Sequence, residues 1–272
     1  MKPLLSICCT TYNHEKYIKE TLDGFLAQQT SFPIEIIVHD DASIDKTAEI
    51  IREYAAKDSR IVPILQTVNQ YSQNIKPWAN YVFPKVQGKY IALCEGDDYW
   101  TDPLKLQKQV DFLENNDDFE LCFHNSKKYF QGKGEFEINT ASSRMPSVTT
   151  VIDLVDYCFI ATPTVVIRNN FKLPDWFDYS PVGDWPLFFI QVGDGKIKKL
   201  DDYMAVYRVH EKGMWTGKSE IEKMQTDHDT IKMLIENRVL PEQAHKKLKK
   251  KFNKLKKKLI KEHLKEFFNL KN

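Results

Sequence analysis

Apolar runs and amphipathic segments alternate along the first half of the chain. Four apolar runs lack the polar alternation of a half-exposed strand: residues 4–9, 34–38, 61–65 and 90–94. Such runs are typical of strands that are buried on both faces of a parallel sheet. Residues 17–29, 45–58 and 103–116 instead repeat apolar positions at the spacing of a helix. The pattern predicts an α/β, Rossmann-like domain in which helices flank a mainly parallel sheet.

The second half of the chain has a less regular pattern. Residues 119–130 predict a strand that enters a hairpin, and a helix, a break and a short strand are expected around Pro163. A short helix is expected from Asp184, and residues 196–210 predict two short strands with a turn. The chain after Trp215 is expected to be mainly helical. We therefore divide the chain into two halves of one domain and a C-terminal helical extension: residues 1–100, 101–215 and 216–272.

Polar clusters follow three of the predicted buried strands. They read TTYN at residues 10–13, HDDAS at residues 39–43 and EGDD at residues 95–98. Parallel strands present their carboxyl ends at one edge of the sheet, and ligands of such sheets bind there. The three clusters, together called the polar edge below, are therefore expected to meet in one binding site.

Asp97 and Asp98 are candidate metal ligands. Successive side chains of an extended segment point to opposite sides, so the two carboxylates cannot bind one ion in the same way. One would bind a divalent metal directly, and the other would bind through water or accept a ribose hydroxyl. Ligation by oxygen alone selects Mg²⁺ or Mn²⁺, which commonly bridge carboxylates and a diphosphate. The alternative is an acidic turn that caps the following helix.

Asp40 and Asp41 form a second acidic pair, at the end of another predicted strand. A carboxylate only accepts hydrogen bonds, so it suits the imide N–H of uracil or thymine, or guanine N1–H. The alternative is a turn in which the acid and Ser43 precede the next helix. Further polar groups for a nucleoside come from the first cluster: Thr10, Thr11, Tyr12 and Asn13.

The chain contains neither of the glycine-rich phosphate motifs, G-x-G-x-x-G and G-x-x-x-x-G-K-[ST]. Its 10 glycines do not cluster after the first predicted strand. A diphosphate at the polar edge would therefore need another source of positive charge. A metal held by Asp97 and Asp98 would supply that charge.

The charge of the chain is unevenly distributed, although its formal net charge is only +1. The tail from His245 onward carries 12 lysines and two acids, so the rest of the chain is acidic. The five cysteines form no C-x-x-C pair, and no secretory signal is apparent, which predicts a cytoplasmic protein. No apolar run approaches the length of a transmembrane helix.

Three motifs in this order, SICCTTYN, IIVHDDASIDKT and YIALCEGDDYW, resemble those of the family 2 glycosyltransferases of the GT-A fold. The resemblance covers about residues 4–215. It implies that a sugar moves with inversion from a nucleotide-diphosphate donor, with UDP or dTDP favoured, to a hydroxyl acceptor. The implied acceptor is a saccharide or a lipid-linked saccharide in surface polysaccharide synthesis. The implied cofactor is Mn²⁺ or Mg²⁺.

The resemblance also implies roles for individual residues of the polar edge. Nucleotide binding is assigned to five of them: Thr10, Tyr12, Asn13, Asp41 and Asp97. The last acid of EGDD, Asp98, is implied to be the direct metal ligand. Asp97 would then contact the ribose or the metal through water.

A second set of implied residues lies later in the chain. The catalytic base of the family matches Asp184 in PVGDWPLFF, and a helix N-cap is the alternative. The R-x-H motif of the family matches Arg208 and His210, where the histidine would contact metal or diphosphate; a histidine in a surface turn is the alternative. Lys212 and Trp215 follow in HEKGMWTGK, which predicts a lid over the donor or a diphosphate contact.

Two stretches depart from the pattern of the family. Residues 69–80 read NQYSQNIKPWAN instead of carrying the usual glycine and Arg-Asn pair, which leaves the contacts to the base open. Trp185 and Pro186 follow Asp184 where small or charged residues are usual, which leaves the acceptor pocket undefined.

The lysine-rich tail predicts an amphipathic helix. Its apolar stripe consists of Leu248, Phe252, Leu255 and Leu259, continued by Ile260, Leu264, Phe267 and Phe268. A basic amphipathic helix is typical of a membrane-surface element, which would suit a lipid-linked acceptor at the inner face of the cell membrane. Packing on the body and a coiled-coil dimer are the alternatives, so the oligomeric state stays open.

Other functional classes fit the sequence less well. A nucleotidyltransferase with the same sheet should carry a glycine-rich basic loop after the first strand, and TTYNHEKY is not such a loop. Nucleic acid is not expected as a partner, because an acidic edge repels phosphates without a metal. A non-catalytic nucleotide-sugar-binding protein stays an alternative, and it would need no base.

Overall fold

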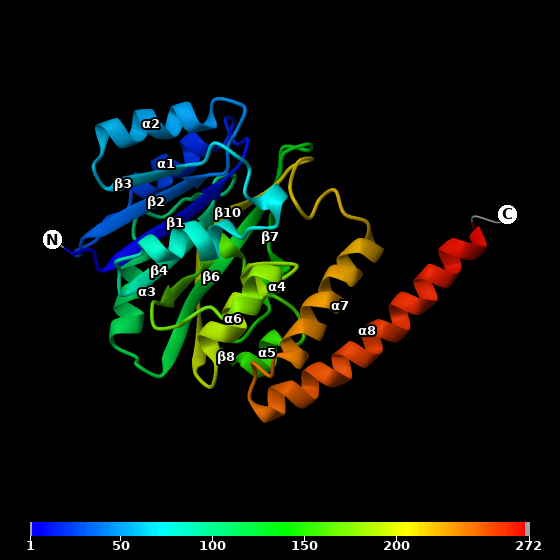
Figure 1. Ribbon diagram of the computed structural model, residues 1–272. Coiled ribbons are helices and arrows are strands. Elements are labelled where there is room, and N and C mark those ends of the chain that lie inside the picture. The colour runs from blue at the N-terminus through cyan, green and yellow to red at the C-terminus, as the bar shows by residue number, and fades with distance from the viewer. Residues whose placement is uncertain (1, 270–272) are drawn as a thin grey trace.

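Ten strands form one sheet in this computed structural model, which describes residues 2–269, with side chains through residue 266 (Figure 1). The strands are β1 (Leu5–Thr11), β2 (Ile34–Asp40), β3 (Ile61–Leu65), β4 (Tyr90–Glu95), β5 (Tyr99–Trp100), β6 (Phe119–Phe130), β7 (Glu135–Ile138), β8 (Val148–Thr150), β9 (Val166–Arg168) and β10 (Lys196–Val209). Their order is β3-β2-β1-β4-β9-β6-β10-β5, with β7 beside β6 and β8 beside β10.

The sheet is parallel in its first part and mixed beyond it. Strands β3, β2, β1 and β4 are parallel to one another, as predicted. Strand β9 runs antiparallel to both β4 and β6, and it joins this part to the parallel pair of β6 and β10. The α/β class is therefore confirmed, with a more mixed sheet than the sequence indicated.

Helices cover both faces of the sheet (Figure 1). They are α1 (Ile18–Leu26), α2 (Thr47–Lys57), α3 (Lys105–Glu114), α4 (Thr140–Ser143), α5 (Val151–Leu154), α6 (Asp184–Val192), α7 (Glu220–Glu236) and α8 (Glu242–Asn269). Shorter 3-10 or π turns lie at Tyr71–Gln73, Trp78–Val82, Phe83–Lys85, Thr162–Thr164 and Asp175–Tyr179.

Neighbouring side chains of β1 enter two different apolar cores. Leu5, Ile7 and Cys9 pack with side chains of α1, α2 and α3 on one face of the sheet. Cys8 packs on the other face, in the core that contains side chains of α5, α6, α7 and α8. All four side chains are fully buried. Cover on both faces explains why the strand sequences do not alternate between apolar and polar residues.

The expectation of two short strands at residues 196–210 is wrong, because this segment forms the single long strand β10. The irregularity that suggested a turn is a bulge, since the pairing of β10 with β6 shifts between Leu200 and Tyr203 and again before Ala205. A bulge bends a strand without ending its ladder. The continued strand carries Arg208 to the polar edge.

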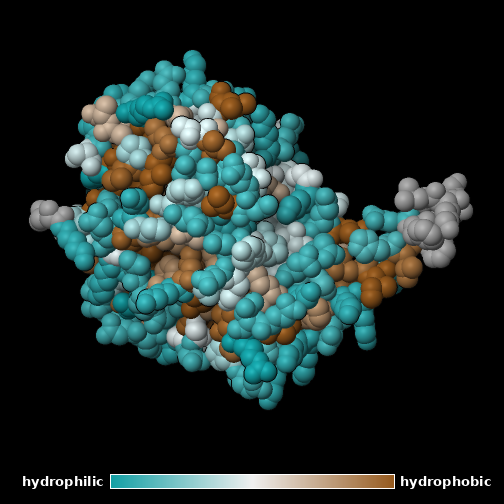
Figure 2. All heavy atoms as spheres, viewed as in Figure 1, coloured by the Kyte–Doolittle hydropathy of each residue, from teal (hydrophilic) through white to brown (hydrophobic). Residues whose placement is uncertain are grey.

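The first part of α8 packs against α7 and the body, and its last part projects away from both (Figure 1). Leu248 is fully buried, and the Phe252 ring stacks on His228 with centroids 4.7 Å apart. Ile260 and Leu264 are about half exposed, and Figure 2 shows hydrophobic atoms on the projecting part, bordered by hydrophilic ones. The remaining members of the predicted stripe lie outside the described side chains: Phe267 and Phe268.

Within residues 2–269, none of the helices is both long enough and apolar enough to cross a membrane.

Candidate active site

Strand pairing brings the three clusters of the polar edge together. Strand β1 lies between β2 and β4, so its end has a neighbour on each side. Thr11 pairs with Asp40 of β2, and Thr10 pairs with Glu95 of β4. The expected convergence of the clusters is thus a direct result of the strand register.

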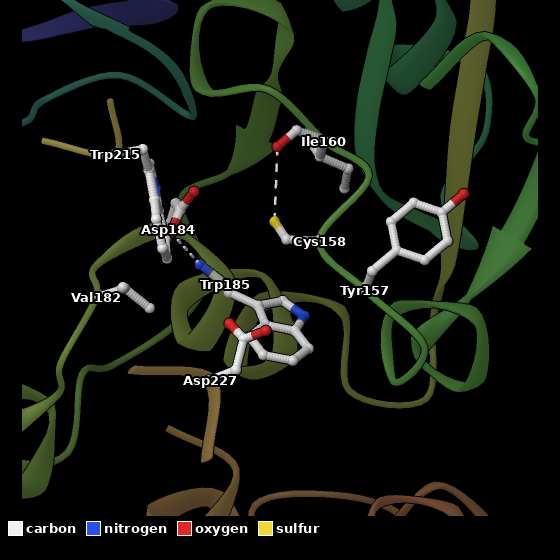
Figure 3. Close-up of a pocket in the computed structure, with 8 residues that line it drawn as sticks. All are labelled: Tyr157, Cys158, Ile160, Val182, Asp184, Trp185, Trp215 and Asp227. Atoms are coloured by element: carbon white, nitrogen blue, oxygen red, sulfur yellow. Dashed lines mark hydrogen bonds between the residues drawn. The ribbon is translucent and has the colours of Figure 1, made fainter. Parts of the chain in front are cut away.

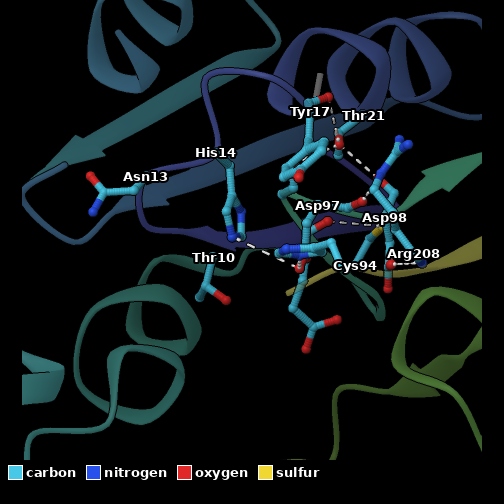
Figure 4. Close-up of polar contacts among 12 residues, drawn as sticks. Thr10, Asn13, His14, Tyr17, Thr21, Cys94, Asp97, Asp98 and Arg208 are labelled. Atoms are coloured by element: carbon cyan, nitrogen blue, oxygen red, sulfur yellow. Dashed lines mark hydrogen bonds and ion pairs between the residues drawn. The ribbon is translucent and has the colours of Figure 1, made fainter. Parts of the chain in front are cut away.

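The turn after β4 lies very close to β1 (Figure 4). Gly96 donates its N–H to the Thr10 carbonyl at 2.9 Å, and Thr21 Oγ1 donates to the Asp98 carbonyl at 2.6 Å. A Cβ atom at Gly96 would lie 2.7 Å from the Thr11 side chain, so only glycine fits without a backbone shift. This close approach fixes the position of the two acids that follow.

Asp97 faces two histidines. His210 Nε2 lies 3.0 Å from Asp97 Oδ2, and His14 Nε2 lies 3.8 Å from the same oxygen. Burial alone would raise the pKa of Asp97, but the hydrogen bond from His210 and the charges of both histidines lower it overall. The Asp97 side chain is 19% exposed, so a charged carboxylate can be reached by a ligand.

Asp98 lies deeper than Asp97 and is only 2% exposed. Its Oδ1 accepts the backbone N–H of Arg208 at 2.7 Å. Burial, together with the charges of Asp97 and Glu95, raises the pKa of Asp98 well above its ordinary value. This geometry favours Asp97 as the acid that meets a ligand, the reverse of the roles implied by the resemblance.

The Arg208 side chain holds the turn that carries Asp97. Its guanidinium donates to the Asp97 carbonyl at 2.8 Å and to Glu20 Oε2 at 2.6 Å. It also lies over the rings of Tyr17 and Tyr99, 4.9 Å from each centroid. Arg208 is therefore buried beside the polar edge, where its contacts hold the turn that carries Asp97 and Asp98.

The acids after β2 hold neighbouring loops. Asp41 accepts the N–H groups of Gln70 and Tyr71 at 2.7 and 3.0 Å, one on each carboxylate oxygen. Asp40 Oδ2 accepts the N–H of Ser43 at 3.0 Å. Asp41 thus fixes the loop that departs from the pattern of the family. Each oxygen of Asp41 already accepts one backbone N–H, so a nucleobase N–H that bonds to Asp41 must share an oxygen with one of them.

In the first cluster, the Asn13 side chain bonds to a neighbouring loop, whereas the Tyr12 ring is more exposed. Asn13 Oδ1 accepts the N–H of Ile44 at 2.9 Å, and the Asn13 N–H donates to Ser43 Oγ at 2.8 Å. Asn13 therefore connects the first two clusters. Tyr12 is 43% exposed and Thr10 is partly buried, so both can be reached from solvent.

Asp184 lines a cavity of about 280 Å³ on the side of the sheet that α5 to α8 cover (Figure 3). The other lining residues are Tyr157, Cys158, Ile160, Val182, Trp185, Trp215 and Asp227. Asp184 is the first residue of α6, and its Oδ1 accepts the N–H of Trp185 at 2.7 Å. Burial raises the pKa of Asp184, and the charge of Asp227 raises it further.

Glu95 connects the polar edge with this cavity. Burial raises the pKa of Glu95 to about 8, and the charges of Asp97 and Asp184 both contribute. Its Oε2 has no hydrogen-bond partner among the described side chains and backbone. The two regions are also joined by one segment, since His210 bonds to Asp97 and Trp215, five residues later, lines the cavity.

The connection from β10 to α7 adds the last residues expected from the sequence. Lys212 is exposed, whereas Trp215 lines the cavity. The segment is a series of turns, in which the Gly213 N–H donates to the His210 carbonyl at 3.0 Å. Lys218 Nζ lies 5.1 Å from the centroid of the Trp215 ring. The segment therefore begins at the polar edge and reaches the cavity.

Several residues of the site were not predicted from the sequence. His14 beside Asp97 belongs to TTYNHEKY, so its place within the first motif was an available signal. Glu20 on α1 pairs with Arg208, and only the structure shows this contact. Asp227 comes from a helix without a motif, and nothing in the sequence pointed to it.

The residues around Asp97 fit a metal that binds together with a ligand. Within residues 2–266, no group of three or more His, Cys, Asp or Glu side chains is arranged to hold a metal alone. Asp97 and His210 offer one carboxylate and one imidazole side by side. Mg²⁺ and Mn²⁺ accept such a small protein set when phosphate oxygens and water complete the coordination.

Comparison with known sequences identifies relatives of this chain. The profile described as Glycosyl transferase family 2 matches residues 6–164. The Mycobacterium bovis protein Mb1547 is 42% identical over 78% of this chain, and the chain spans only 60% of that relative's length. The Escherichia coli UDP-Glc:alpha-D-GlcNAc-diphosphoundecaprenol beta-1,3-glucosyltransferase WfaP is 32% identical over 76% of this chain and 78% of its own.

Solved structures share the GT-A fold with this chain. S. aureus TarS 1-349 in complex with UDP-GlcNAc has a TM-score of 0.67 at 20% identity, covering 94% of this chain and 72% of that chain. The mannosyltransferase PcManGT from Pyrobaculum calidifontis, in complex with GDP-Man and Mn²⁺, has a TM-score of 0.63 at 16% identity. This match covers 93% of this chain and 70% of the PcManGT chain. At such identities the likeness shows the fold alone.

Proposed function

Because the chain belongs to glycosyl transferase family 2, we propose that it moves a sugar from a nucleotide-diphosphate donor to a hydroxyl group, with inversion. The observation that carries this proposal is the position of Asp184. This acid lines a cavity beside the polar edge, and burial raises its pKa. A base with room for an acceptor thus lies next to the strand ends at which such folds bind nucleotides.

In the proposed reaction, the acceptor oxygen attacks the anomeric carbon of the donor sugar. The bond from this carbon to the diphosphate oxygen breaks, and the nucleoside diphosphate leaves with the bonding electrons. Asp184 accepts the proton of the attacking hydroxyl. General-base help of this kind contributes about 10²–10⁴-fold to a rate, and a raised pKa makes the carboxylate a stronger base.

A UDP-sugar is the proposed donor, with a dTDP-sugar as the alternative. The name of the E. coli relative includes UDP-Glc, and the TarS structure contains UDP-GlcNAc. Asp41 suits the imide N–H that uracil and thymine share, provided that the base binds beside the existing backbone donors. Thr10, Tyr12 and Asn13 would complete the nucleoside site.

Mn²⁺ or Mg²⁺ is proposed to bind with the donor, with Asp97 rather than Asp98 as its carboxylate ligand. Asp97 is partly exposed, whereas Asp98 is buried against Arg208. His210 would be a second ligand or a contact to the diphosphate. The bound ion would stabilise the charge of the leaving diphosphate. The Mn²⁺ in the complex of the archaeal mannosyltransferase supports this proposal.

The proposed acceptor is a lipid-linked saccharide of surface polysaccharide synthesis. The name of the E. coli relative includes a lipid-linked acceptor, alpha-D-GlcNAc-diphosphoundecaprenol. The projecting part of α8 exposes Lys257 and Lys261 near Ile260 and Leu264. Lysines near anionic lipid contribute about 1 kcal/mol each. All five cysteines are free thiols, which supports the inner, reducing face of the membrane as the place of action.

Flotation with anionic vesicles tests this membrane contact. The chain should float at low salt, and a double variant, Lys257→Gln with Lys261→Gln, should float less. Neutral vesicles and high salt are the matched controls, because both remove the electrostatic attraction. A chain that never floats with anionic vesicles would rule out the contact.

Residues 210–218 are proposed to act as a lid over the bound donor. They connect the polar edge to the cavity through a series of turns, and most of these residues are exposed. Hydrogen exchange in this segment should slow when donor and metal are added. Unchanged exchange in the presence of a donor that binds would exclude a lid.

A thermal-shift panel tests the proposed function directly. UDP-, dTDP-, GDP- and CMP-sugars are each added with and without Mn²⁺, because a ligand of the native state raises its Tm. A UDP-sugar should stabilise the chain in a metal-dependent way and should be hydrolysed slowly to UDP. A chain that neither responds to any nucleotide sugar nor hydrolyses one would contradict the proposal.

A further inference from the structure

The cavity beside Asp184 is built by segments that lie far apart in the sequence and far from the nucleotide motifs. Its walls come from the connection after α5, the start of α6, the connection after β10, and α7 (Figure 3). All eight lining residues follow residue 150, whereas the polar edge is made by residues before 100. The cavity therefore lies in the part of the molecule that is free to recognise something other than the nucleotide.

The ionisable carboxyl groups that line this cavity are hydrogen-bond acceptors when charged. Asp184 and Asp227 each contribute a carboxylate, which can only accept when ionised. Three potential donors of the lining are already engaged, since Trp185 Nε1 donates to the Leu154 carbonyl at 3.0 Å, Tyr157 Oη to the Ala141 carbonyl at 3.3 Å and Cys158 Sγ to the Ile160 carbonyl. Trp215 Nε1 has no hydrogen-bond partner among residues 2–266 and is the one neutral donor left to a ligand. The cavity thus suits a neutral ligand with hydroxyl groups, and it disfavours a phosphate.

Asp227 is a partly buried acid without a partner in the described structure. Among residues 2–266, no hydrogen bond or ion pair satisfies its carboxylate, and burial raises its pKa. The charge of Lys251 on α8 opposes that rise and so favours the ionised form. An acid at a cavity wall with no protein donor on its carboxyl group is left to bond with a ligand or with water.

The other walls of the cavity are apolar and aromatic. Trp215, Trp185, Val182 and Ile160 contribute most of them. A sugar ring combines an apolar C–H face with hydroxyl groups at its edge, so it matches aromatic walls that carry two acceptors. The volume of about 280 Å³ lies near the lower end of the roughly 300–1,000 Å³ of ligand pockets, which suits one ring.

We propose that this cavity seats one pyranose ring of the acceptor, with the ring's apolar face on Trp215 and a hydroxyl on Asp227. This inference rests on the proposed glycosyl transfer, in which Asp184 deprotonates the reacting hydroxyl. Asp227 binds a neighbouring hydroxyl of the same ring and so selects the acceptor. An acceptor without that hydroxyl leaves a partly buried carboxylate without a donor, which is a basis for discrimination.

The helix α8 fixes the far wall of this seat. Lys251 Nζ donates to the carbonyls of Val155 and Asp156 at 3.0 and 2.5 Å, just before the cavity residues of that segment. The same ammonium lies 4.6 Å from the centroid of the Trp185 ring. The seat is therefore attached to the C-terminal helix as well as to the sheet, which limits its freedom to adapt to different rings.

Ligand-observed NMR on the full chain tests this seat without a nucleotide. The probes are methyl glycosides of glucose, galactose, mannose and N-acetylglucosamine, with glycerol as a non-ring polyol control. At least one methyl glycoside should bind. Asp227→Asn should weaken its binding at least tenfold, and Trp215→Ala should abolish it.

Two matched variants control for changes in fold and in the surrounding segment. Tyr179→Ala changes an exposed aromatic residue at the end of the Asp175–Tyr179 turn, and Asp229→Asn changes an acid two residues beyond Asp227 on the same helix. Neither residue lines the cavity. Both variants should bind the methyl glycoside as the parent chain does, and the unfolding temperatures of all four variants show whether each is folded.

Three outcomes would overturn the seat. One is that no methyl glycoside binds the parent chain, and another is that the folded Asp227→Asn and Trp215→Ala variants bind as tightly as the parent. The third is that a nucleotide sugar displaces the methyl glycoside, because the cavity would then hold the donor ring. A chain that binds methyl glycosides but neither binds nor hydrolyses a nucleotide sugar would retain the seat and refute the proposed transfer.

Discussion

The polar edge and the cavity both contain carboxylates, but the acids have different surroundings. In the polar edge, Asp98 accepts the Arg208 N–H and Asp41 accepts two backbone N–H groups. In the cavity, Asp184 accepts only the N–H of its own neighbour, and Asp227 has no partner among the described residues. Acids of the first kind stabilise the loops that form the site, whereas acids of the second kind are available to a ligand.

This contrast follows from how the two regions are built. The polar edge continues strands whose register is fixed, so its acids meet backbone donors of adjacent turns. The cavity forms where helices and connections of the second half come together, and among residues 2–266 its two acids accept one backbone N–H, that of Trp185. Unpartnered acids are costly to bury, so their persistence is expected at a functional site.

The largest expected effect is on catalysis, through the variant Asp184→Asn. Asparagine keeps the shape of the side chain but cannot accept the proton of the acceptor hydroxyl. We expect kcat for sugar transfer to fall about 10²–10⁴-fold. The donor-induced rise in Tm should stay unchanged, because the polar edge is intact.

The control for this measurement is Asp194→Asn, which alters an exposed acid just after α6. It should keep full activity. If Asp184→Asn transferred sugar at the parent rate, the cavity acid would not be the base, and the contrast between the two regions would lose its functional meaning.

The second largest expected effect is on the free energy of unfolding, because α8 packs against the core on the cavity side of the sheet. Leu248 is fully buried in the core that also contains α5 and α6. Leu248→Ala should lower the free energy of unfolding by about 2–5 kcal/mol, as is usual for a buried leucine. Leu264→Ala, at a half-exposed position of the same helix, should change it by less than about 1 kcal/mol. Urea unfolding of both variants measures the difference.

Equal losses from the two leucine variants would contradict this arrangement. They would mean that the projecting part of α8 is as well covered as its first part, for instance by a second copy of the chain. Repeating the unfolding at several protein concentrations separates that outcome, because the stability of a dimer depends on concentration.

Much of the polar edge could be predicted from the sequence, because local patterns determine it. Apolar runs predicted the strands, and parallel strands place their ends together, so Asp41, Asp97 and Asp98 were expected in one place. What the sequence did not provide was the depth of each acid. Which of Asp97 and Asp98 is exposed depends on two tertiary contacts. Gly96 packs against Thr11 of β1, and the backbone N–H of Arg208 on β10 bonds to Asp98.

The cavity could not be predicted in the same way, because no local pattern describes it. Asp227 lies on a helix whose residue spacing resembles that of any exposed helix, and only tertiary packing places it opposite Asp184. The bulge that keeps β10 continuous was interpreted as a turn for the same reason, since pairing with β6 decides it. The tail was interpreted as a membrane-surface element with packing on the body as an alternative, and the burial of Leu248 supports that alternative for the first part of α8.

The third effect tests whether the polar edge is held by internal partners. Arg208 is buried and bonded to the Asp97 carbonyl and to Glu20, so Arg208→Ala removes charged hydrogen bonds and ring contacts. The free energy of unfolding should fall by about 2–3 kcal/mol without any nucleotide present. Glu20→Gln, which keeps a hydrogen-bond acceptor, should lose less than half of that amount.

A purely ligand-binding role for Arg208 makes the opposite prediction. In that case, Arg208→Ala would leave the unfolding of the nucleotide-free chain unchanged and would reduce only the affinity for the donor. Calorimetry of the free chain, followed by a donor titration, distinguishes the two roles.

The smallest expected effect is a stability gain from Asp184→Asn, and its sign depends on pH. Burial raises the folded-state pKa of Asp184 above its unfolded value, so the folded state binds the proton more tightly than the unfolded state does. The parent chain therefore loses stability as pH rises from the unfolded value through the folded one, and asparagine avoids that loss. At neutral pH, Asp184→Asn should raise Tm by less than Arg208→Ala lowers it, and below the unfolded pKa the gain should vanish.

Asp194→Asn should show no such trend, because the acid is exposed. A stability loss at neutral pH would show that Asp184 is satisfied by its surroundings, as Asp41 and Asp98 are, and that it is not available to a ligand.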